Sequence, residues 1–221
     1  EIDPEYASAY SSRGEAKYKL EDYYGAIADH TKAVEIDPEY ASAYSSRGEA
    51  KYELEDYYGA IADHTKAVEI EPDYSFYYSF RGDAKLDLED YSGAIVDYNK
   101  AIELDPQNAS AYFFRGKAKY KLEDYSGAIE DYTKAIEINP ENASAYDFRG
   151  RSKYFLDNEP AAIRDFTKAI ELDPENTTAY FFRGKAKYYL EVYRGAIADY
   201  TKAIEIDPEY ASAYSSRGEA K

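Results

Sequence analysis

The strongest constraint on the fold of this chain is that it repeats itself. Its first seventeen residues, EIDPEYASAYSSRGEAK, recur unchanged at residues 35–51 and 205–221, and looser copies return every 34 residues in between. A proline marks each copy: Pro4, Pro38, Pro72, Pro106, Pro140, Pro174 and Pro208. A fixed 34-residue period indicates one supersecondary unit stacked on copies of itself, not a globular domain with a single closed core. Such a stack presents a long surface suited to binding.

Each unit reads as a pair of helices. In residues 7–40, helical spacing of apolar and small residues extends over about 7–20 and again over about 25–36. Acidic residues between these stretches predict an N-cap, and Asp37 before Pro38 ends the second helix, because a residue before proline avoids the α region. Gly14 falls inside the first helix at a cost of about 1 kcal/mol relative to alanine. We attribute this glycine to the close approach of another backbone.

At these positions the unit resembles the tetratricopeptide repeat, whose pattern is W-x2-L-G-x2-Y, then A-x3-F, then P. In the first unit the pattern is carried by Tyr10, Gly14, Ala26, His30, Ala33 and Pro38, and in the fourth by Tyr112, Gly116, Ala128, Tyr132, Ala135 and Pro140. Tyrosine replaces the tryptophan throughout, and arginine takes the leucine position. The resemblance implies an all-α, right-handed superhelical solenoid of antiparallel helix hairpins.

The period also predicts the organisation of the chain. Six tandem repeats are expected at residues 7–40, 41–74, 75–108, 109–142, 143–176 and 177–210. Residues 1–6 read as the tail of a truncated preceding repeat, and residues 211–221 as the first helix of a seventh. Because the chain lacks methionine and starts and stops inside a repeat, we interpret it as a fragment of a longer array or an engineered array.

Composition excludes several classes of function. A formal net charge of −17 argues against binding to nucleic acid or to an anionic membrane surface, since both need a cationic face. No apolar run is long enough to span a bilayer, and no signal-like segment is visible. The absence of cysteine excludes disulfides, thiolate chemistry and zinc fingers. We expect a soluble, intracellular protein.

Catalysis has little support. The only histidines, His30 and His64, occupy a repeat position that elsewhere holds tyrosine or phenylalanine, which indicates a packing role. No nucleophile or glycine-rich phosphate loop accompanies them, and no carboxylates show the spacing of an EF-hand or of a histidine–carboxylate metal set. The sequence therefore predicts no enzyme, no cofactor and no metal site.

An arginine column runs through the repeats, facing an aspartate column on the second helices. The arginines are Arg13, Arg47, Arg81, Arg115, Arg149, Arg183 and Arg217, and the aspartates are Asp29, Asp63, Asp97, Asp131, Asp165 and Asp199. A partly buried arginine needs a paired carboxylate, so these columns predict a structural ion ladder. Each arginine could meet the aspartate of its own repeat or of the preceding one, and the sequence leaves both open.

The remaining cations point to a binding surface. Of 27 lysines and arginines, 20 occupy three repeat-fixed columns, and six of the other seven lie in repeats four to six. The resemblance implies that first helices line a concave groove, which in these repeats carries Phe113, Phe114, Lys117, Tyr120, Lys121, Phe148, Arg151, Tyr154, Phe155, Phe181, Phe182, Lys185, Tyr188 and Tyr189. In the first two repeats the same positions are mostly serine, with Glu15 and Glu49.

Aromatic rings interleaved with cations are typical of hot spots for an extended peptide, and a positive field favours acidic residues or a C-terminal carboxylate. The sequence therefore predicts a protein–protein interaction scaffold that binds an acidic or aromatic-acidic peptide. Alternatively, these aromatic residues pack between helices, and the cations only offset the negative charge of the surface.

A second function stays open. Neither end of the chain carries the polar cap that solenoids use to cover their terminal repeats, so copies could stack head to tail into a self-assembling array. Fraying of the terminal residues is the simpler alternative.

Overall fold

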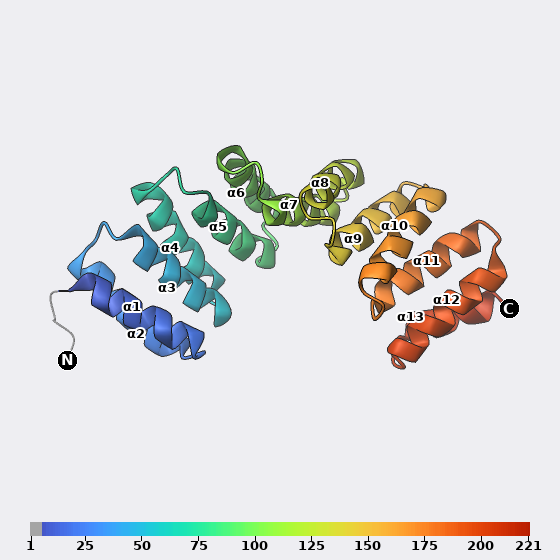
Figure 1. Ribbon diagram of the computed structural model, residues 1–221, viewed down its shortest axis with the longest axis horizontal. Coiled ribbons are helices and arrows are strands. Elements are labelled where there is room, and N and C mark those ends of the chain that lie inside the picture. Colours follow the sequence, from blue (N-terminus) through green and yellow to red (C-terminus); the bar gives the residue numbers. More distant parts are fainter. Residues whose placement is uncertain (1–5) are drawn as a thin grey trace. The chain divides into compact units, whose positions relative to one another are not determined.

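The computed structural model describes residues 6–221, which form thirteen α-helices and contain no β-strand (Figure 1). The predicted tail of a preceding repeat at residues 1–6 lies, apart from Tyr6, outside the described residues. The helices are α1 Ala7–Lys19, α2 Tyr23–Ile36, α3 Ala41–Glu53, α4 Tyr57–Ile70, α5 Ser75–Asp87, α6 Tyr91–Leu104, α7 Ala109–Lys121, α8 Tyr125–Ile138, α9 Ala143–Phe155, α10 Glu159–Leu172, α11 Thr177–Tyr189, α12 Tyr193–Ile206 and α13 Ala211–Glu219. The all-α class is confirmed.

The chain divides into two compact units, Glu1–Gln107 with α1 to α6 and Asn108–Lys221 with α7 to α13. Within each unit, every helix packs against the next one along the chain (Figure 1). First helices of successive repeats also touch, α1 with α3 and α3 with α5 in the first unit, and α7 with α9 and α9 with α11 in the second. Each unit therefore has a continuous face built from its first helices.

The turn inside each hairpin has the hydrogen bonds of a Schellman motif. After α1, the Asp22 N–H donates to the Lys17 carbonyl at 3.0 Å and the Glu21 N–H donates to the Tyr18 carbonyl at 2.9 Å. Glu21 has a φ of 61°, in the left-handed region where glycine is usual, and its counterparts in the next five repeats are also acidic residues with positive φ. The Asp22 side chain then accepts from the Gly25 N–H at 2.9 Å, so α2 begins at Tyr23, two residues earlier than predicted.

The turn between repeats follows the sequence prediction. The α2 helix ends at Ile36, and Asp37 before the proline is extended, with a φ of −126°. Three later first helices begin with an asparagine N-cap, as when the Asn142 side chain accepts from the Ala145 N–H at 3.0 Å. Pro160 lies at the start of α10, where its missing N–H is harmless.

Among residues 6–221, no helix is both long and apolar enough to cross a membrane.

In the six full repeats, the glycine inside the first helix accommodates an aromatic ring, not another backbone as the sequence suggested. A Cβ added to Gly14 would lie 2.7–2.9 Å from three ring atoms of His30. The next five repeats have the same arrangement, with His64, Tyr98, Tyr132, Phe166 and Tyr200 as the ring. These six ring residues are at most 1% exposed. A ring from the second helix thus fills the notch that the glycine leaves in the first.

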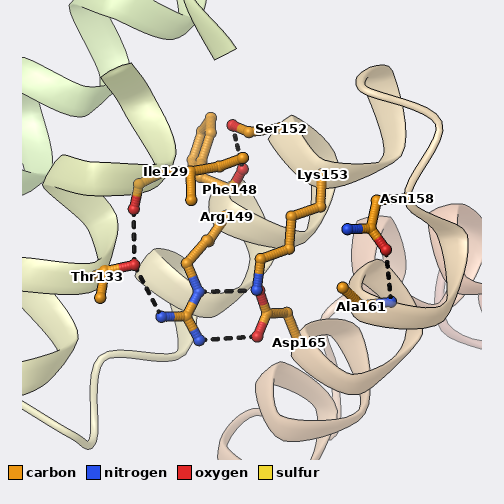
Figure 2. Close-up of polar contacts among 9 residues, drawn as sticks. All are labelled: Ile129, Thr133, Phe148, Arg149, Ser152, Lys153, Asn158, Ala161 and Asp165. Carbon is orange, nitrogen blue, oxygen red and sulfur yellow. Dashed lines mark hydrogen bonds and ion pairs between the residues drawn. The ribbon is translucent and has the colours of Figure 1, made fainter. Parts of the chain in front are cut away.

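The ion ladder joins the two helices of each repeat and reaches back to the preceding repeat. Figure 2 shows one rung: Arg149 donates to both carboxylate oxygens of Asp165, at 2.8 and 2.9 Å, and Lys153 donates to the same carboxylate at 2.7 Å. A further Arg149 N–H donates to the Thr133 hydroxyl at 3.2 Å (Figure 2). The arginine also lies over the ring of Tyr146, 5.4 Å from its centroid.

The pairing left open by the sequence is now fixed. In all six complete repeats the arginine pairs with the aspartate of its own repeat, at 2.5–2.8 Å. The Arg13 guanidinium holds the pKa of the Asp29 carboxyl below its usual value. Arg217, the seventh member of the column, donates to Thr201 at 3.4 Å and lies over the Tyr214 ring.

The fit of each ring against a glycine predicts that glycine-to-alanine substitutions change the free energy of unfolding differently in different repeats. Gly150→Ala places its Cβ 2.8 Å from Cε1 of the buried Phe166, so we expect a loss of about 1–3 kcal/mol in the free energy of unfolding. Gly218→Ala is the matched control at the same repeat position in α13, because, apart from its chain neighbours and the backbone of its own helix, no atom of the described residues comes within 4 Å of its added Cβ. It should stabilise by up to about 1 kcal/mol. Urea unfolding followed by circular dichroism measures both, and equal effects would contradict the fit.

The ion ladder predicts that removing the aspartate costs more stability where its arginine is buried than where its arginine is exposed. Asp165→Ala leaves the Arg149 and Lys153 side chains, only 14% and 20% exposed, without a carboxylate, so we expect a loss of about 3 kcal/mol. In the first repeat the Arg13 side chain is 47% exposed, and water can replace the lost partner. Asp29→Ala should therefore cost about 1 kcal/mol or less. A larger loss for Asp29→Ala than for Asp165→Ala in urea unfolding would contradict the role of burial.

Candidate functional site

The first helices of the second unit carry a continuous set of aromatic contacts. Phe148 of α9 lies edge-on to Phe113 and Tyr120 of α7, with centroid distances of 5.8 and 5.7 Å. Phe182 of α11 approaches Tyr154 and Phe155 of α9 at 5.7 and 6.2 Å. Such edge-to-face spacing is favourable for aromatic pairs. We give the name aromatic face to the exposed and half-buried residues of this set together with their neighbouring cations. They are Phe113, Phe114, Lys117, Tyr120, Lys121, Phe148, Arg151, Phe155, Phe182, Lys185, Tyr188 and Tyr189.

The structure places the predicted groove residues at different depths. Phe155 and Tyr189 are exposed at 43% and 62%, and Lys121 is also exposed. The half-buried members are Phe113, Phe114, Lys117, Tyr120, Phe148, Arg151, Phe182, Lys185 and Tyr188.

Two predicted groove residues belong to the core instead. Tyr154 and Phe181 are each 8% exposed. Each packs in a buried hydrophobic cluster that joins its own repeat to the next one. Phe181 contacts the rings of Tyr200 and Tyr210, at 5.9 and 5.0 Å. These two residues support the aromatic face from below and are not part of its contact surface.

Three cations of the aromatic face lie over rings. The Lys185 ammonium is 5.3 Å from the Tyr154 centroid and 5.8 Å from that of Phe182. The Lys117 ammonium is 5.9 Å from the Phe114 centroid, and the Arg151 guanidinium is 4.2 Å from that of Phe148. Cation–π contacts of this kind hold each cation against an apolar surface while leaving hydrogen-bond donors for a ligand.

Arg151 differs from the two lysines because it has an internal carboxylate. Asp147, one turn earlier in α9, accepts from Arg151 and is 3% exposed. Burial raises the pKa of Asp147 although the guanidinium opposes this shift. Within the described chain, the second carboxylate oxygen of Asp147 has no hydrogen-bond partner, nor does the nearby buried Tyr132 hydroxyl. The pair therefore neutralises one of the three cations.

The first unit presents a different surface at the same repeat positions. Here a hollow of about 180 Å³ is lined by Glu15, Tyr18, Lys19, His30, Ser46 and Glu49. A second hollow, of about 300 Å³, shares Ser46 and Glu49 and extends towards Phe80. Burial, reinforced by the charges of Glu53 and Glu15, raises the pKa of Glu49 to about 7. Ser46 and Glu49 thus stand at the repeat positions where the second unit has Phe148 and Arg151.

The two histidines are neutral core residues. Burial lowers the pKa of each to about 4, so both imidazoles are uncharged at neutral pH. His64 lies 3.5 Å from the Ser45 hydroxyl and beneath the ring of Phe80, at 5.5 Å. Residues 6–221 contain no group of three histidine or acidic side chains placed to hold a metal ion.

Comparison with protein families identifies the repeat. Models described as "Tetratricopeptide repeat" match residues 7–40, 109–142 and 143–176, and one described as "TPR repeat" matches residues 82–123 and 184–221. The chain belongs to the tetratricopeptide repeat family. Proteins of this family generally act as non-catalytic scaffolds for protein–protein interaction. A search of curated protein sequences gave no significant match.

Solved tetratricopeptide repeat structures share the fold. A crystal structure of the MamA protein is 25% identical, with a TM-score of 0.71 over 76% of this chain and 92% of its own. YrrB, described as a TPR protein with an unusual peptide-binding site, is 24% identical, with a TM-score of 0.75 over 86% of this chain and 97% of its own. PilF of Pseudomonas aeruginosa is 16% identical, with a TM-score of 0.83 over 96% and 97%. The likeness to YrrB and PilF is one of fold alone.

Sequence reasoning missed two features of these tetratricopeptide repeat faces. It did not identify Asp147 as the internal partner of Arg151, although the i, i+4 spacing of the two was available. It also read His30 and His64 as equivalent, whereas one ring is covered by a phenylalanine and the other borders a hollow. The residue sixteen positions later, Phe80 or Ser46, carries this difference.

The raised pKa of Glu49 predicts a pH-dependent stability. Its side chain is faced by Glu15, Tyr18 and Lys19 of α1, His30 of α2, Glu53 of α3 and Tyr77 of α5. Because the folded pKa is about 7 and the ordinary value is 4.5, protonated Glu49 contributes stability below pH 4.5 that is lost as the pH rises through 7.

Glu49→Gln should therefore match the native chain at pH 4 and exceed it at pH 8 by about 2 kcal/mol in the free energy of unfolding. Urea unfolding across this range measures the difference. Glu39→Gln, in an exposed turn, is the matched control and should leave the profile nearly unchanged. A Glu49→Gln advantage that does not grow with pH would contradict the assignment.

Proposed function

We propose that this chain is a non-catalytic interaction scaffold whose aromatic face, on α7, α9 and α11, binds an extended acidic or aromatic-acidic peptide. The observation that carries the proposal is the set of ammonium groups held over rings, with Lys117 over Phe114 and Lys185 over Phe182. A peptide carboxylate can pair with such an ammonium while its neighbouring side chains pack on exposed rings such as Phe155 and Tyr189.

The charge of the whole chain sharpens this selectivity. The net charge is −17, so an acidic peptide is repelled from most of the surface and attracted only where cations gather. Lys117, Lys121 and Lys185 supply that local excess on first helices, while lysines on second helices lie beside glutamates, as Lys134 does with Glu137. The description of YrrB as a peptide-binding tetratricopeptide repeat protein is in keeping with this class of ligand.

Arguments against catalysis also come from the residues present. Both histidines are neutral and buried in packing positions, so neither presents an accessible general base. The chain charge likewise disfavours nucleic acid and anionic membranes as partners.

The test is a displayed-peptide selection followed by affinity measurement on the enriched sequences. We expect acidic or aromatic-acidic peptides, whose affinity falls at least about tenfold in Lys117→Glu/Lys185→Glu. Lys134→Glu/Lys202→Glu is the matched control: it makes the same charge change on second helices and should leave the affinity within about twofold. Arg151 stays unchanged because its removal would leave buried Asp147 without its partner. No enrichment, or equal losses in both double variants, would refute the proposal.

Asp147→Asn is a further variant for the same test, and it should increase the affinity for an acidic peptide. It removes the carboxylate that neutralises Arg151, so the aromatic face gains one net positive charge. Affinity for the enriched acidic peptide should rise several-fold, whereas a neutral peptide of the same length should be unaffected.

Head-to-tail self-assembly is the alternative function. Light scattering on the same samples distinguishes it, since assembly predicts a mass that grows with concentration, whereas the scaffold predicts a constant mass that saturates with peptide.

A further inference from the structure

The hollow beside His30 lies where a covering ring that is present in three other repeats is absent. His64 lies under Phe80, Tyr132 under Phe148, and Phe166 under Phe182, with centroid distances of 5.5, 5.8 and 6.1 Å. In each pair the covering ring lies sixteen residues further along, on the first helix of the next repeat. The corresponding residue for His30 is Ser46, which is too small to cover it and lines the hollow.

The floor of this hollow has an unsatisfied polar group. His30 is 0% exposed, and within the described chain neither of its ring nitrogens has a hydrogen-bond partner. Burial keeps the imidazole neutral, so one nitrogen is an acceptor without a donor. Buried polar groups are nearly always hydrogen-bonded, and an orphan at the wall of a hollow indicates a missing partner.

The walls are acidic. Glu15 of α1 and Glu49 of α3 line the hollow, and neither has a hydrogen-bond or ion-pair partner within residues 6–221. Glu53 lies nearby, where its carboxylate accepts from the Tyr18 hydroxyl at 3.2 Å. The one cation in the lining is Lys19, an exposed side chain. A positively charged group entering here would meet two unpaired carboxylates and a neutral acceptor.

We propose that the hollow beside His30 binds a single arginine side chain of a partner polypeptide. A guanidinium has donors enough for both carboxylates and the imidazole nitrogen at once, and its flat, weakly hydrated face packs on the ring of Tyr18. The volume of about 180 Å³ is below that of drug-sized ligand sites and suits one side chain. The first unit thus has a site whose charge preference is opposite to that of the aromatic face.

This inference stands apart from peptide binding by the aromatic face, which is built from other helices, so either can fail without the other. The chain has only two histidines, and His64 serves as an internal reference because Phe80 covers it.

The test is a titration of the chain with Nα-acetyl-arginine amide at pH 8, where Glu49 is ionised, followed through the imidazole nitrogen resonances by NMR. We expect a saturable shift at His30 and none at His64. Nα-acetyl-citrulline amide, which is neutral and nearly isosteric, should give no saturable shift. Absence of saturation with the arginine probe, or an equal response to the citrulline probe, would overturn the proposal. An equal or tighter response to Nα-acetyl-lysine amide would overturn the guanidinium assignment.

Three variants complete the test. Glu49→Gln should weaken the arginine probe at least about tenfold. Ser46→Phe installs over His30 the ring that Phe80 places over His64, and should abolish the shift. Ser12→Phe, the same substitution at the exposed equivalent position in α1, is the matched control and should retain it. Unchanged binding in Ser46→Phe would show that the probe binds elsewhere and would overturn the site.

Discussion

Each hairpin closes around one aromatic ring that fits the notch left by a glycine, and much of the surface follows from that fit. The ring of His30, Tyr132 or Phe166 is held against the first helix of its own repeat, with its other face turned to the next repeat. The residue sixteen positions later, on the next first helix, decides whether a second ring covers that face. Phe148 and Phe182 cover it, whereas Ser46 does not.

One repeat position thereby accounts for both candidate sites. Where the covering residue is phenylalanine, its outer edge becomes part of an aromatic face on which lysines can lie, as Lys185 does over Phe182. Where it is serine, a hollow lined by Glu15 and Glu49 remains, and burial raises the pKa of Glu49 to about 7. The same scaffold thus offers a cationic surface in one unit and an acidic one in the other, with no change in its helices.

Charged residues in this chain divide into structural and surface sets because their burial differs. The guanidinium of Arg149 is held between Asp165, Thr133 and the Tyr146 ring, so it specifies how two helices and two repeats meet. Lys117 and Lys185 rest on rings without such a fork, and their donors stay available. Arg151 lies between these cases, since buried Asp147 holds it at the edge of the aromatic face.

The sequence by itself determined the repeat, the helix pairs, the proline turns and the all-α class, because each is set by local spacing and by backbone preferences that recur every 34 residues. It also separated the repeat-fixed cations from those that vary. Only the tertiary structure decided that Gly14 faces a ring, that each arginine pairs within its own repeat, and that Tyr154 and Phe181 are buried. These depend on which side chains meet across helices, and a column of equivalent residues such as His30 and His64 looks uniform until the residue covering each ring is known.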